Sequence, residues 1–246
     1  MSKQKQANPK VNKLIMYLLA GTVVLMTGML IYIFTAPKHT NQQPKQPEQA
    51  TSQTEKNGYD AYAGIKKDDI DSRGQLWEVA FYPEQIPIAA LVHIDSIDGG
   101  RNYSPIYEKY VLSQTYGKMT VLEVYKGDVH PGQKLVYSRY GGIITAQEYL
   151  NALNTPGIEE TYLHGGRPSE KKFVKEYIVD DIDVEVGKTY LAYMAPESSK
   201  NGKYLEYSIS GVQFGFREVR GSGDNISVLN NGTKDWESLN VVVKLK

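Results

Sequence analysis

The chain contains no cysteine, which excludes a disulfide scaffold and every metal site built on thiolates. Net charge is also missing, because 28 basic and 28 acidic side chains cancel over 246 residues, and this excludes a nucleic-acid binder defined by bulk charge. Only four histidines occur, with no pair at metal-ligand spacing, and the motifs GxSxG, HExxH and GxxxxGK[ST] are absent. The sequence therefore assigns no catalytic residue, no cofactor and no nucleic-acid partner.

One long apolar run dominates the amino-terminal region. Residues 14–36 carry no charge, and at about 1.5 Å per residue a helix of 23 residues spans a hydrocarbon core of about 30 Å. More lysines precede this run than follow it closely, which places the amino terminus in the cytoplasm. A cleaved signal peptide is the alternative, but the run is too long and Phe34 is too bulky for the cleavage site. We expect a signal anchor in the cell membrane.

The rest of the chain divides by composition. Residues 37–58 are polar and rich in glutamine and proline, which predicts a disordered linker with a reach of about 25 Å. Residues 59–246 are long enough for one hydrophobic core, and their 21 basic and 26 acidic side chains give a net charge of −5. The sequence thus predicts a cytoplasmic basic arm (1–13), a transmembrane helix (14–36), a linker (37–58) and an extracellular β domain (59–246).

Short apolar stretches of period two, bounded by turn residues, predict a mainly β, antiparallel domain. The expected strands are 88–94, 118–125, 134–140, 189–194, 204–210, 214–219, 226–229 and 240–245. Thr145 and Glu148 have the spacing of a capping box, which predicts a short helix that ends before Pro156. A second short helix is expected from 170 to 177, with Ser169 as its cap.

Three sequence features follow one another as in a known family. They are Val-Tyr-Lys-Gly at 124–127, a Pro-Gly-Gln turn that opens the stretch 131–137, and Val-Gly-Lys-Thr-Tyr-Leu at 186–191. Their order resembles the netrin-like, or TIMP-like, OB barrel, and is similar to exported domains of Gram-positive bacteria. The resemblance covers 88–216 and implies a five-stranded Greek-key barrel with an outward binding face. Those inhibitors chelate zinc through an amino-terminal cysteine, which this chain lacks, so the inhibitory activity is not carried over.

A candidate ligand site lies where the stretch 134–140 runs into a glycine pair. Arg139 offers planar donors for a carboxylate, and Tyr137 and Tyr140 offer aromatic surface. Gly141 and Gly142 would let a ligand approach the backbone. These five residues form the predicted ligand-binding site.

Alternating acids follow between residues 181 and 185. Asp181, Asp183 and Glu185 would share one face of an extended segment, with apolar residues on the other face. Such carboxylates suit a calcium ion or the acid pair of a glycan hydrolase. Period-two alternation alone also explains the pattern as a solvated strand face, so no metal is assigned and the ion site is kept as an alternative.

Two classes of function remain. The first is a binding or scaffolding module, held near the membrane by its own helix, that recognises an envelope protein, a peptide or a cell-wall polymer. The alternative is an extracytoplasmic carboxylate-dependent hydrolase, which needs a pocket with two acids about 5 to 9 Å apart and at least one of them desolvated. The sequence favours the binding module, because an anchor, a linker and an aromatic-rich β domain are sufficient for it.

Overall fold

The computed structural model describes residues 58–77, 81–155 and 167–243. The predicted basic arm and transmembrane helix lie outside the described residues, and so does the linker apart from Gly58. Within the described ranges, no helix has both the length and the apolar character that crossing a membrane requires. All of these residues belong to one unit, 46–246.

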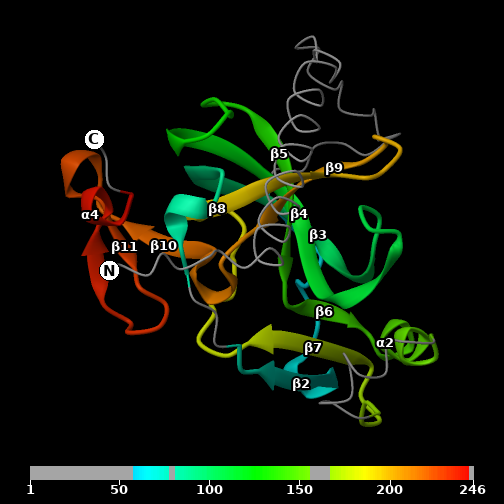
Figure 1. Cartoon of the computed structure of the whole chain (residues 1–246). Coiled ribbons are helices and arrows are strands. Elements are labelled where there is room, and N and C mark those ends of the chain that lie inside the picture. The colour runs from blue at the N-terminus through cyan, green and yellow to red at the C-terminus, as the bar shows by residue number, and fades with distance from the viewer. Residues whose placement is uncertain (1–57, 78–80, 156–166, 244–246) are drawn as a thin grey trace, which may run out of the picture. The chain divides into compact units, whose positions relative to one another are not determined.

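The described part of the chain is mainly β, as predicted (Figure 1). Its strands, in chain order, are β1 (Tyr59–Asp60), β2 (Ile70–Gln75), β3 (Ile88–Ser104), β4 (Lys109–Lys126), β5 (Lys134–Tyr140), β6 (Gly142–Thr145), β7 (Phe173–Ile178), β8 (Thr189–Ser198), β9 (Leu205–Ile209), β10 (Phe216–Arg220), β11 (Ser227–Leu229) and β12 (Trp236–Ser238). Two α-helices accompany them, α2 (Ala146–Leu153) and α4 (Leu239–Val243). Short 3-10 turns occur at Lys67–Asp69, Pro83–Gln85, Val212–Phe214 and Gly223–Asn225.

Five strands pair in a closed ring. β3 pairs antiparallel with β4 on one edge and with β8 on the other, β4 pairs antiparallel with β5, and β8 with β9. The parallel pair β5–β9, with Tyr137 opposite Tyr207, closes the ring. Alternate residues of all five strands meet inside it, as the period-two pattern requires. The fully buried members of this core include Val92, Ile94, Met119, Val121, Tyr137, Tyr190, Met194 and Phe216.

β3 and β8 are buried on both of their faces. Their second faces contribute Leu91, Leu191 and Tyr193 to a separate cluster, which is completed by Val228 of β11 and Leu239 of α4. The carboxy-terminal strands and α4 therefore cover the outside of the ring at β3 and β8. This double burial accounts for the uninterrupted apolar runs at 88–92 and 190–194 in the sequence.

A separate three-stranded sheet has the order β2-β7-β6, and α2 packs beside it (Figure 1). The predicted capping box is present, because the Thr145 hydroxyl accepts the Glu148 amide N–H (3.2 Å) and the Glu148 carboxylate accepts the Thr145 N–H (2.8 Å). Tyr149 and Ala152 of α2 are buried against Ile144 and the neighbouring sheet.

Two predicted elements were wrong. The stretch 170–177 was expected to be helical but contains most of β7, in which Val174, Glu176 and Ile178 are buried in alternation between β2 and β6. The stretch 240–245 was expected to be a strand, but α4 occupies Leu239–Val243. The pairing is also less uniformly antiparallel than predicted, since β1–β3, β2–β7 and β5–β9 are parallel.

Candidate functional site

A cleft of about 560 Å³ lies where β5 passes into β6, next to β7 and the segment that follows it. Its lining combines the 139–143 junction with Lys175 and Tyr177 of β7, and with Asp181 and Asp183. Asp60, the last residue of β1, and Tyr62, which follows this strand, also line the cleft. The cleft therefore brings together segments more than 100 residues apart in the sequence.

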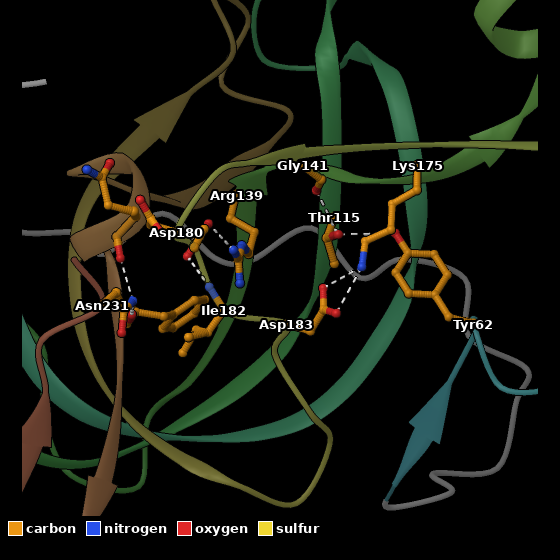
Figure 2. Close-up of polar contacts among 12 residues, drawn as sticks. Tyr62, Thr115, Arg139, Gly141, Lys175, Asp180, Ile182, Asp183 and Asn231 are labelled. Atoms are coloured by element: carbon orange, nitrogen blue, oxygen red, sulfur yellow. Dashed lines mark hydrogen bonds and ion pairs between the residues drawn. The ribbon is translucent and has the colours of Figure 1, made fainter. Parts of the chain in front are cut away.

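Arg139 and Asp181 form an ion pair in the wall of this cleft. Their side chains are 11% and 7% exposed, and Nη2 of Arg139 donates to Oδ2 of Asp181. The other carboxylate oxygen accepts the backbone N–H of Ile182 at 2.8 Å, which fixes the orientation of the acid (Figure 2). Burial raises the pKa of Asp181, and this effect outweighs the opposing effects of Arg139 and the backbone. The pair is thus desolvated but satisfied.

A hydrogen-bonded chain ties the residues after β1 to the β5–β6 junction. The Tyr62 hydroxyl accepts the Ile143 backbone N–H (3.1 Å) and lies 3.1 Å from the Thr115 hydroxyl, which itself donates to the Gly141 carbonyl (2.8 Å) (Figure 2). Because the Thr115 proton is used toward Gly141, Tyr62 donates to Thr115. Burial raises the pKa of Tyr62, so the phenol remains protonated at neutral pH and this chain stays intact.

The glycine pair was predicted to let a ligand approach the backbone, and the packing of the chain also requires glycine at these positions. Gly141 adopts φ +84°, which favours glycine, and a Cβ there would lie 3.2 Å from the Glu176 carbonyl oxygen. A Cβ on Gly142 would lie 2.9 Å from both the amide nitrogen and the hydroxyl of Thr115. Close contact with β4 and β7 therefore requires small residues at both positions.

The remaining charged groups of the cleft also have partners. Lys175 donates to both oxygens of Asp183, at 2.7 and 2.9 Å, although the Asp183 side chain is 79% exposed (Figure 2). Glu176 is buried and accepts hydrogen bonds from the backbone and side chain of Ser113 and from Gln75 (3.3 Å). Asp60 accepts the Tyr62 backbone N–H at 2.8 Å. Each of the four carboxylates that line the cleft thus accepts at least one hydrogen bond.

The structure brings most of the predicted site residues together. Arg139, Tyr140, Gly141 and Gly142 all line the cleft, whereas Tyr137 is fully buried inside the five-stranded ring, edge-on to Phe216. The acids from the alternating segment diverge from one another. Asp181, Asp183 and Glu185 pair with three different cations, the last of these being Lys188.

Within the described ranges, no cluster of three or more His, Asp or Glu side chains is arranged to hold a metal ion. The divergence of the three acids explains this result for the segment that suggested calcium. Each carboxylate is directed to its own cation, and their oxygens do not converge on one point.

The lining residues that were not predicted from the sequence include Tyr62, Lys175 and Tyr177. Lys175 and Tyr177 were hidden by the helical interpretation of 170–177, since a strand interpretation places both on the exposed side of β7. Tyr62 gave no signal, because it belongs to a polar stretch with no periodicity.

Comparison with family models, with curated proteins and with solved structures found no match in any of the three cases.

Proposed function

We propose that this protein is a single-pass, membrane-anchored binding module whose extracellular domain recognises a component of the cell envelope. The apolar run 14–36 and the distribution of lysines around it support the anchor and its orientation. The domain is proposed to be an OB-like barrel. The ring order β3-β4-β5-β9-β8, with one parallel pair and with α2 between the third and fourth ring strands, supports that assignment.

The observation that carries the proposal is the state of Arg139. Within residues 58–77, 81–155 and 167–243, its side chain forms one hydrogen bond, from Nη2 to Asp181. Its Nε and Nη1 have no hydrogen-bond partner there and are not completely buried, although the side chain as a whole is only 11% exposed. A guanidinium that is held by a buried acid and still has free donors is suited to bind a ligand rather than only to stabilise the fold.

The hydrolase alternative has one observation in its favour. Asp181 is desolvated and has a raised pKa, as a general acid requires, and it shares the cleft with Asp183. However, Asp181 has an arginine partner and Asp183 a lysine partner, so each acid would have to leave its cation before it could act on a substrate. The binding module therefore needs fewer rearrangements of the observed contacts.

The function can be tested with the full chain in detergent, immobilised and exposed to solubilised membrane and cell-wall fractions over a salt series. We expect capture of an envelope component that survives moderate salt, and its loss in the variant Tyr140→Ala. The matched control is Tyr103→Ala, because Tyr103 is also an exposed tyrosine but lies outside the cleft. Equal capture by both variants would contradict the proposed site.

The proposed topology needs a separate experiment. Protease added to intact cells should degrade the domain from residue 59 onward and leave the amino-terminal arm protected. Protection of the domain, or its release into the medium without the segment 14–36, would contradict the anchor.

A further inference from the structure

The ligand of the cleft can be specified by chemical class, an inference that rests on the proposed binding function. The first constraint comes from charge. Arg139 and Lys175 are each paired with an acid, and Asp60 and Glu176 add two more carboxylates to the lining. An anionic ligand would have to approach four carboxylates in a partly desolvated cleft, where like charges are costly.

A cationic ligand fits no better. Asp181 and Asp183 are already paired with Arg139 and Lys175. Glu176 is buried with both oxygens bonded, and Asp60 accepts the Tyr62 backbone N–H. The guanidinium of Arg139, which lies in the wall of the cleft, also repels a cation. The lining therefore favours an uncharged ligand that carries hydrogen-bond acceptors.

The second constraint comes from two exposed aromatic rings. Tyr140 and Tyr177 line the cleft, with exposed fractions of 37% and 39%. The Tyr140 ring stands edge-on to Trp77, with ring centroids 5.3 Å apart. The end of the Tyr177 ring lies over Gly74, where a Cβ would approach it to 2.9 Å. Both rings thus have a packing partner within the fold and still present apolar surface to a ligand.

A ligand that matches both constraints has apolar C–H faces for tyrosine rings and hydroxyl or acetamido groups for the guanidinium. From this match we infer that the cleft binds an uncharged saccharide segment, with Arg139 donating to its oxygens and Tyr140 and Tyr177 contacting its ring faces. Hydroxyls both donate and accept, so they also suit the mixed donors and acceptors of the lining. The cleft volume of about 560 Å³ lies within the range of about 300–1,000 Å³ usual for small-ligand sites.

The test is calorimetric titration of the full chain in detergent with tetrasaccharides that differ in charge. The neutral probes are N-acetylchitotetraose, cellotetraose and mannotetraose. The charged probes are the cationic chitosan tetramer and the anionic tetragalacturonate. We expect at least one neutral probe to bind more tightly than either charged probe. Binding of no neutral probe, or tighter binding of a charged one, would overturn the saccharide inference.

Two variants locate the binding without removing the buried charge. Arg139→Lys keeps a cation beside Asp181 but loses the guanidinium fork, and we expect neutral-saccharide binding to weaken by about tenfold to a hundredfold. Gly74→Ala lies outside the lining and displaces the Tyr177 ring, so it should weaken binding as well. Tyr103→Ala is the control and should bind as the wild type does.

The outcomes separate this inference from the proposed function. If saccharide binding is unaffected by both Arg139→Lys and Gly74→Ala, the cleft is not the saccharide site and the inference fails. If no neutral saccharide binds while capture of envelope material still depends on Tyr140, the ligand class is wrong and the binding function stands. If that capture is also independent of Tyr140, both proposals fail.

Discussion

The burial of the ion pair between Arg139 and Asp181 predicts a large loss of stability when either partner is removed. Both side chains are nearly inaccessible, so removing one partner leaves the other charge desolvated without compensation. For Arg139→Ala we expect a loss of about 3–5 kcal/mol in the free energy of unfolding. At about 2–4 °C per kcal/mol for a domain of this size, the melting temperature should fall by roughly 6–20 °C.

A double-mutant cycle distinguishes the pair from ordinary loss of packing. Asp181→Ala should cost a similar amount to Arg139→Ala, and the double variant should cost less than the sum by about 2 kcal/mol or more, because no charge is left buried alone. Urea unfolding of the full chain in detergent, followed by the fluorescence of Trp77 and Trp236, gives all four values. Lys172→Ala is the control, since it breaks an exposed pair with Asp69 and should cost less than about 1 kcal/mol.

The same cycle has a pH dependence whose sign is fixed by Asp181. Its folded-state pKa is raised, so the ionised acid destabilises the folded state, and this cost is relieved as the pH falls through the folded pKa. In Arg139→Ala the acid is buried without its cation, and the relief should be larger. The cost of Arg139→Ala should therefore shrink between pH 7 and pH 4. Single costs below about 1 kcal/mol, additivity of the two changes, or a cost independent of pH would refute this reasoning.

Three further changes probe the fold. Gly117→Ala would place a Cβ 2.1 Å from the carbonyl oxygen of Ser96, so we expect a loss of at least about 3 kcal/mol in urea unfolding, and a change below about 1 kcal/mol would contradict it. Thr145→Ala removes the side-chain cap of α2 and should cost about 1 kcal/mol in the same assay; no change would show that the cap is dispensable. Burial raises the pKa of Glu237, but the hydrogen bonds that its carboxylate accepts, first of all from Arg217, have the larger combined effect and lower this pKa. The ionised carboxylate should therefore stabilise the fold at pH values above its ordinary pKa of 4.5. As the pH falls below that value, the wild type should lose its higher free energy of unfolding relative to Glu237→Gln. A difference in the free energy of unfolding that does not change with pH would contradict this.

Burial periodicity was the part of the fold that the sequence could reveal. The predicted stretches 118–125, 134–140 and 189–194 lie within β4, β5 and β8, whose alternate residues fill the ring core. The helix after Thr145 could also be predicted from the sequence, because a capping box is a local signal. The period-two alternation and the capping box both depend on neighbours within a few residues, so they can be recognised without knowledge of the tertiary structure.

Elements that depend on distant partners were misread. Phe173, Val174 and Tyr177 have a spacing that suits one face of a helix, yet β2 and β6 pair with this segment and make it a strand. The outer halves of β3 and β4, residues 95–117, are rich in Gly, Ser, Asn and Asp, so period two is obscured there. Pairing along the hairpin, with repeated register shifts, holds these polar residues in extended form.

The candidate site shows the same limit for charged residues. Arg139 could be singled out by its place before a glycine pair, but nothing in the sequence indicates that its partner is Asp181 rather than Asp183, two residues further on. Glu206 is a parallel case. It alternates with the apolar residues Leu205 and Tyr207 in β9, and it is buried in a two-pronged pair with Arg101, which is 105 residues away.

In both cases the alternation of residue types correctly separates the two faces of a segment and leaves open what covers the polar face. A polar face that remains in water gives solvated acids, whereas one covered by another segment needs a cation from that segment, because a buried carboxylate without a partner is too costly. At Glu206 every guanidinium nitrogen of Arg101 donates a hydrogen bond, to Glu206 or to Gln114. At Asp181 the same compensation leaves Nε and Nη1 of Arg139, in the wall of a cleft, without a hydrogen-bond partner among the described residues. That difference between two otherwise similar ion pairs is the physical reason to place the ligand site at Arg139 and not at Arg101.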